Sequence, residues 1–119
     1  MSMYRQHILE LYKHPLNQGH VQNPTHSAEK KNESCGDKIS IELEIDNDNK
    51  VADVKFQGEG CAISQAAASL LTDHIKGMTL DEVKVIDGPE MLSILGIEVS
   101  AMRLKCAMLA LETVKEAVK

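Results

Sequence analysis

The chain has 119 residues, of which 43% are hydrophobic and 26% are charged, a balance typical of a globular protein with one core. Its formal net charge of -5 argues against non-specific nucleic-acid binding, because phosphate recognition needs a basic surface. No run of about eighteen apolar residues could cross a bilayer, and the polar start MSMYRQH is unlike a signal peptide. We therefore expect one cytoplasmic domain over residues 1–119 that binds neither nucleic acid nor membrane.

The first third of the chain predicts one helix followed by a long loop. In the segment MYRQHILELYKH, apolar residues recur at helical spacing and form one side of the predicted helix: Tyr4, Ile8, Leu11 and Tyr12. Pro15 ends this pattern. From Pro15 to Ser34 the sequence has no hydrophobic period and is rich in Asn, Ser, Gly and charge, which predicts a mobile loop.

Two alternating segments then predict an antiparallel hairpin. The first, KISIELEI, carries a core-facing row of Ile39, Ile41, Leu43 and Ile45. The second, VADVKF, offers Ala52, Val54 and Phe56. The DNDNK stretch between them has the composition of a turn. Matching the two rows places position 45 opposite 52, and a register with 45 opposite 51 stays open.

The rest of the chain predicts helices. A helix over 61–77 has an apolar side made of Ile63, Ala67, Leu70, Leu71 and His74. A short helix follows the cap Thr79, and another begins near Pro89. Ser100 caps a last helix from Ala101 to about Val118, whose core stripe comprises Leu104, Ala107, Leu111, Val114 and Val118. We expect an α+β fold in which helices cover a small antiparallel sheet, formed by the hairpin plus a possible third strand.

The cysteines suggest a metal site. Cys35 and Asp37 share the parity of the core-facing row, and hairpin pairing brings both within about one residue of Cys61. Cys61 begins a helix, and Cys106 lies at the shoulder of the buried face of the last helix. Three thiols and one carboxylate form a candidate tetrahedral site for zinc or iron–sulfur chemistry. The alternative is that each free thiol is an ordinary small buried side chain.

Lys105 directly precedes Cys106, and a positive charge beside a thiol favours the thiolate. We expect Lys105 to tune the charge of that thiol or to form a salt bridge with Asp37, and the alternative is an exposed surface lysine. Among the four candidate ligands, the hard oxygen of Asp37 should exchange most readily.

Four segments, ELYKHPLNQG, CGDKISIELEI, VKFQGEGCAISQAAASLLTDHIKG and RLKCAMLAL, resemble the iron–sulfur cluster assembly scaffold family of IscU, SufU and the N-terminal domain of NifU. The resemblance implies a SufE/NifU-like fold and a scaffold that accepts sulfur from a cysteine desulfurase. It implies that Cys35, Asp37, Cys61 and Cys106 bind iron or a [2Fe-2S] cluster, with zinc as an alternative occupant. Cys35 and Cys106 are then candidate persulfide acceptors, and iron–sulfur acceptor proteins receive the product.

This chain departs from each branch of that family. IscU-type scaffolds carry histidine where Lys105 stands, a feature that, with FQGEGCAIS, points to SufU. The insertion of SufU is nevertheless missing from the stretch between Gly77 and Ser100, and IEVSA replaces the Leu-Pro-Pro-Val-Lys chaperone signal of IscU. A zinc-dependent sulfurtransferase that activates a desulfurase is therefore the alternative function, and a regulatory or structural zinc protein is a third. We expect a carrier rather than an enzyme, as a monomer or weak homo-oligomer.

Overall fold

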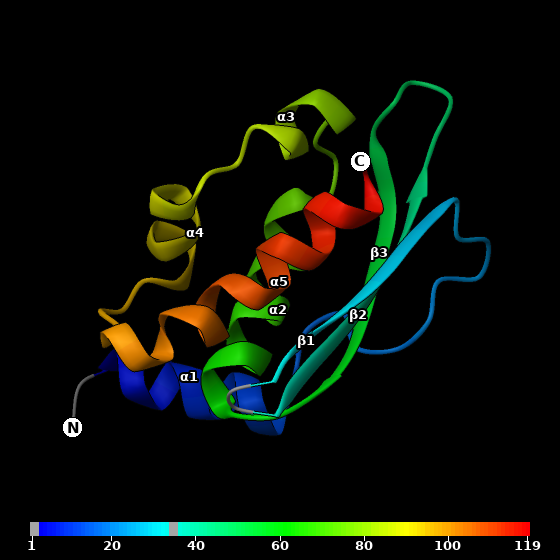
Figure 1. Ribbon diagram of the computed structural model, residues 1–119. Coiled ribbons are helices and arrows are strands. Elements are labelled where there is room, and N and C mark those ends of the chain that lie inside the picture. Colours follow the sequence, from blue (N-terminus) through cyan, green and yellow to red (C-terminus); the bar gives the residue numbers. More distant parts are fainter. Residues whose placement is uncertain (1–2, 34–35) are drawn as a thin grey trace.

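The computed structural model describes residues 3–33 and 36–119. Within these residues an antiparallel three-stranded sheet carries helices on one face (Figure 1), which confirms the predicted α+β class. The strands are β1 (His26–Asn32), β2 (Asp37–Ile45) and β3 (Val51–Glu59), and they lie in this order in the sheet. The helices are α1 (Met3–Lys13), α2 (Ala62–Ile75), α3 (Leu80–Lys84), α4 (Gly88–Leu95) and α5 (Leu104–Ala117), and a 3₁₀ turn, η1 (Ala101–Arg103), precedes α5. No described helix is both long and apolar enough to span a bilayer.

Strand β1 lies in the segment that the sequence predicts as a loop, so the loop prediction was wrong over His26–Asn32. The sequence HSAEKKN has little intrinsic preference for a strand. Its conformation comes from pairing with β2, which runs from His26 opposite Leu43 to Asn32 opposite Asp37. Because long-range pairing decides this strand, the local pattern could not reveal it.

The hairpin of β2 and β3 follows the predicted register over most of its length. Ile41 pairs with Phe56, as the match of position 45 with 52 requires. A bulge between Glu44 and Ile45 then shifts the end of the hairpin, so that Ile45 lies opposite Val51. Val51 is buried and Ala52 is exposed, which reverses the predicted orientation of Ala52.

Helices α2 and α5 pack against the sheet and begin at the same end of it (Figure 1). α1 packs against α2, and α4 packs against both α2 and α5. Among the residues whose burial the structure describes, Phe56 is the only aromatic side chain in the core between sheet and helices. At the interface the small residues Ala66, Ala67 and Ala68 of α2 are fully buried, which allows the helix to approach its neighbours closely.

The predicted helix faces are mostly buried, but each contains a residue that the structure exposes. Tyr12 is 48% exposed and Leu104 is 41% exposed, although both were predicted to face the core. His74 is also exposed, and its Nε2 lies 3.8 Å from Glu90 Oε2. In α5 the predicted stripe is buried at Ala107, Leu111, Val114 and Val118 and fails only at Leu104. Contacts with both the sheet and α2 widen the buried face beyond this stripe.

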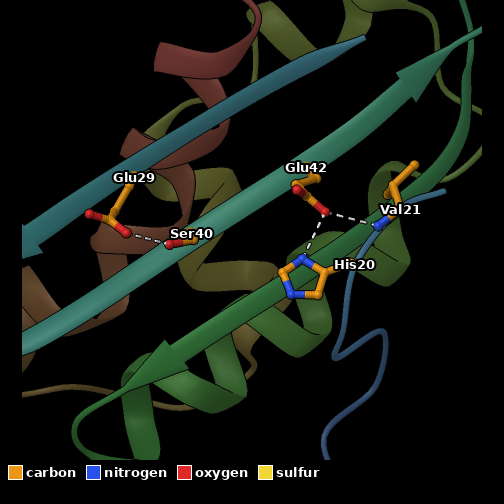
Figure 2. A network of polar contacts seen from close by, with 5 residues as sticks. All are labelled: His20, Val21, Glu29, Ser40 and Glu42. Carbon is orange, nitrogen blue, oxygen red and sulfur yellow. Dashed lines mark hydrogen bonds and ion pairs between the residues drawn. The ribbon is translucent and has the colours of Figure 1, made fainter. Parts of the chain in front are cut away.

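The outer face of the sheet is polar, and Figure 2 shows part of it. Ser40 Oγ donates to Glu29 Oε1 over 2.8 Å. Glu42 Oε1 accepts the Val21 N–H at 2.9 Å and lies 3.2 Å from His20 Nδ1. The segment before β1 is therefore tied to the sheet, in contrast to the predicted mobile loop.

Candidate metal centre

Three chemically active side chains meet where β2, α2 and α5 begin. Asp37 is the first residue of β2, Cys61 is the N-cap residue of α2, and Cys106 lies in the first turn of α5. One carboxylate oxygen of Asp37 and the two Sγ atoms all lie within 4.8 Å of one another. These residues are far apart in the sequence, so the fold alone brings them together.

Asp37 is buried and fixed by the main chain of Cys61. Its side chain is nearly inaccessible, at 1% exposure, and its Oδ1 accepts the Cys61 N–H at 2.9 Å. A buried carboxylate needs such a partner, because the loss of water would otherwise be costly. The same bond orients the second oxygen, Oδ2, toward Cys61 Sγ at 3.9 Å.

Gly60 makes room for this carboxylate. Its φ of +135° is a conformation that residues with a side chain rarely adopt. A Cβ atom at this position would overlap Asp37 Oδ1. The close approach of Gly60 to Asp37 agrees with the predicted register, and it lets the chain turn from β3 directly into α2.

Cys106 lies deeper than the sequence predicts. It is 0% exposed, so its placement at the shoulder of the helix was wrong. Asn32 Nδ2 donates toward Cys106 Sγ over 4.0 Å, and Asn32 itself pairs with Asp37 across the sheet. Sequence reasoning missed Asn32, because its inward parity becomes visible only once β1 is known to be a strand.

The N-termini of two helices face this cluster. The free N–H groups of a helix N-terminus and its dipole favour negative charge nearby, and Cys61 and Cys106 lie at the starts of α2 and α5. Lys105 adds a positive charge in the first turn of α5, but its side chain is exposed. Within residues 3–33 and 36–119 it forms no ion pair with Asp37. The predicted salt bridge is therefore not formed, because both oxygens of the buried Asp37 point toward Cys61.

The donor set suits a metal ion. Ligand atoms around a tetrahedral zinc lie roughly 3.5 to 3.8 Å apart, given bonds of about 2.3 Å to sulfur and 2.0 to 2.2 Å to oxygen. The 3.9 Å between Cys61 Sγ and Asp37 Oδ2 is close to this value. Cys35, the remaining candidate ligand, lies outside the described residues. A hollow of about 390 Å³ adjoins the cluster and is lined by Asn32 and Asp37 together with charged Lys31, Lys38 and Glu59.

The chain is similar to several known proteins. Residues 3–119 match the family described as NifU-like N terminal domain. The zinc-dependent sulfurtransferase SufU of Bacillus subtilis is 44% identical over 80 residues, which are 67% of this chain but only 53% of SufU. The iron-sulfur cluster assembly scaffold protein IscU of Thermotoga maritima is 35% identical over 98% of this chain and 93% of its own length. The crystal structure of FiSufU, from the SUF system of Fervidobacterium islandicum, has a TM-score of 0.80 and 29% identity, with 100% of this chain and 96% of FiSufU covered.

Proposed function

Since the chain belongs to the NifU-like N-terminal domain family, we propose that it is a scaffold for iron–sulfur cluster assembly. In this role it receives iron and sulfur, builds a cluster and passes it to acceptor proteins. The observation that carries the proposal is the convergence of Asp37, Cys61 and Cys106 in one cluster, in which Asp37 and Cys106 are buried and Cys61 is half-buried. The similarity to a named scaffold over almost the whole chain supports it.

The proposal gives four residues the task of holding the cargo, a [2Fe-2S] cluster. Cys35, Cys61 and Cys106 supply thiolates, which are the usual ligands of such clusters, and Asp37 supplies a carboxylate oxygen. The two helix N-termini offset part of the negative charge that these ligands bring. A hard oxygen binds iron less firmly than the thiolates do in such a set, so Asp37 is the ligand that exchanges when the cluster leaves.

Sulfur arrives as the persulfide of a cysteine desulfurase. A thiolate of the scaffold attacks the outer sulfur, a new S–S bond forms, and the desulfurase cysteine leaves as a thiolate. Cys106 has no exposed surface, so an incoming persulfide cannot reach it in this conformation. We therefore assign the first transfer to Cys35 and keep Cys106 as a ligand. Two electrons from an added thiol reductant then convert each transferred sulfur to sulfide.

A zinc-dependent sulfur relay is the second candidate. In it the same ligands hold zinc, and the protein accepts persulfide and activates a desulfurase without building a cluster. The 44% identity to a zinc-dependent sulfurtransferase favours it, as does the suitability of two thiols and a carboxylate for zinc. Both functions need reduced thiols, so we propose that the protein works in a reducing compartment such as the cytoplasm.

Anaerobic reconstitution distinguishes the two functions. The metal-free protein is incubated with ferrous iron, cysteine, a desulfurase and a thiol reductant, and visible absorption and bound iron are followed. The scaffold proposal predicts a coloured cluster that moves to an apo-ferredoxin. Stoichiometric zinc that persists, together with a faster desulfurase and no cluster, would instead establish the relay. A structural zinc site would give neither cluster nor activation.

A further inference from the structure

Asn32 is a buried residue beside the metal centre, on the strand that pairs with the start of β2. It is the last residue of β1 and pairs with Asp37, so the two side chains leave the sheet on the same face. Asn32 is only 9% exposed, and a buried amide has to find its hydrogen-bond partners within the protein. Among the described residues, Cys106 Sγ is the side-chain partner of its N–H group, at 4.0 Å.

The main chain of Asn32 is held firmly in place. Its strand pairs with β2, and its carbonyl oxygen accepts the Gly36 N–H at 2.8 Å. β1 also packs directly against α5, the helix that carries Cys106. The amide and the sulfur are therefore carried by two packed elements, and side chains on such elements are positioned more accurately than side chains on loops.

We propose that Asn32 is a positioning residue of the metal centre. Its amide N–H donates to Cys106 Sγ and orients this sulfur toward the position where a metal ion would also contact Asp37 and Cys61. When the sulfur is a ligand, the same hydrogen bond withdraws electron density from it. This inference rests on the metal-binding function proposed above. A ligand sulfur is negatively charged and can only accept a hydrogen bond, so the contact is stronger with bound metal than with a neutral thiol. Hydrogen bonds to ligand sulfurs are among the features that set metal affinity and reduction potential.

Cys61 has no equivalent donor among the described residues, which makes the two sulfurs different. Ser64 Oγ lies 3.9 Å from Cys61 Sγ, a separation similar to that between Asn32 and Cys106. The Ser64 hydroxyl, however, donates its proton to the Cys61 carbonyl oxygen at 3.0 Å. It therefore has no proton to offer the sulfur. Ser64 is also fully buried, so Ser64→Ala is a matched control that removes a buried polar group beside a ligand sulfur without removing a sulfur donor.

Metal titrations of four proteins test the proposal: the parent, Asn32→Leu, Asn32→Asp and Ser64→Ala. Cobalt(II) reports on the sulfurs through its sulfur-to-metal charge-transfer band, and zinc affinity is measured by competition with a chelator. Both Asn32 variants should shift this band to longer wavelength, because the sulfur becomes richer in electrons. Their zinc affinity should fall about tenfold, as is usual when a partner of a metal ligand is lost. Ser64→Ala should keep the band of the parent.

The wavelength of the charge-transfer band distinguishes an electronic effect of Asn32 on the Cys106 sulfur from a simple loss of structure. A residue that only maintained the fold would lower the affinity and leave the charge-transfer energy unchanged. An unshifted band in both Asn32 variants therefore overturns the proposal. Asn32→Asp keeps the shape of the side chain, so it decides the matter if circular dichroism shows that Asn32→Leu is unfolded. If the parent binds neither ion, the metal-binding function fails as well. If the parent binds both ions and the band of the Asn32 variants is unshifted, only the role of Asn32 is refuted.

Discussion

The two ends of the helix-covered face of the sheet differ in the polarity of their buried residues. At one end, which we call the apolar end, α2 and α5 finish, β3 begins and α3 follows α2 (Figure 1). Its fully or almost fully buried residues are Val51, Ile75, Val83, Ile86 and Val118. Main-chain hydrogen bonds join the segments at this end. Val51 N–H donates to Met78 O at 2.9 Å, and Leu80 N–H donates to Asn49 O at 2.8 Å.

At the other end, the metal end, polar residues and a thiol are buried among the apolar ones: Asn32, Asp37, Ser64 and Cys106. Buried polar groups are costly unless each is hydrogen-bonded, whereas buried aliphatic side chains stabilise the fold in proportion to their apolar area. The same two helices and the same sheet span both ends. The comparison therefore indicates that the apolar end supplies stability and that the metal end uses it to hold reactive groups close together.

The largest expected effect comes from opening a cavity at the apolar end. Ile75 is fully buried in the last turn of α2, and Ile75→Ala should lower the free energy of unfolding by about 2–5 kcal/mol. Zinc affinity of the folded fraction should not change, because the metal end lies at the opposite end of α2. Denaturant unfolding of metal-free protein measures the first quantity and chelator competition the second. Val85→Ala, at a site that is 75% exposed, should change stability by less than about 0.5 kcal/mol. Equal losses in both variants would contradict the assignment of stability to the apolar end.

A smaller effect on stability, with a larger one on metal exchange, is expected at Asp37. Asp37→Ala removes the acceptor of the Cys61 N–H, so the metal-free protein should lose about 1–3 kcal/mol. Asp37→Asn keeps an acceptor oxygen and should lose less. Both variants should release a cluster or zinc more slowly than the parent, since the exchangeable oxygen ligand is lost or weakened while the thiolates stay. Transfer to an apo-ferredoxin measures release, and Asp73→Ala on the exposed side of α2 serves as the control. Release as fast as in the parent would exclude Asp37 as the exchanging ligand.

The hairpin shows how far the sequence could predict this centre. Alternation of period two favours the register that is observed from Lys38 to Glu44, and either register considered brings Asp37 close to Cys61. The burial of Cys106 was not predictable in this way, because contacts with both the sheet and α2 widen the buried face of α5 beyond the predicted stripe. Asn32 was missed for a different reason: β1 is a strand through its pairing with β2, and its polar sequence contains no signal of that pairing.

The smallest expected effect concerns the solvent-facing rim of the apolar end. Thr79 caps α3, and its backbone N–H donates to Glu82 Oε1 at 2.9 Å. This bond holds the pKa of Glu82 below its ordinary value, and the Thr79 side chain adds to the effect. A lowered pKa in the folded state stabilises the fold above the ordinary glutamate pKa, and that contribution is lost as pH falls through the lowered value.

The Glu82 contribution can be measured by thermal unfolding of metal-free protein as a function of pH. The unfolding temperature of the parent should fall as Glu82 becomes protonated, and Glu82→Gln should show a slightly shallower fall because its side chain does not titrate. Glu98→Gln, at an exposed position, should follow the parent. If Glu82→Gln and the parent have the same slope in the acid range, the cap does not contribute through its charge.

The outer edge of β1 has a consequence for how the protein behaves at high concentration. Among the described residues no strand pairs with this edge, so its main-chain N–H and C=O groups could extend a sheet in another molecule. Lys30 and Lys31 stand on this strand, and lysines on an edge strand oppose such pairing between chains. Resistance to fibril-like aggregation therefore depends on a short, charged sequence whose strand character comes from its neighbour. The sequence of β1 has a weak preference for a strand, which is why the strand was not predicted. For the same reason β1 is a poor template for pairing with other molecules.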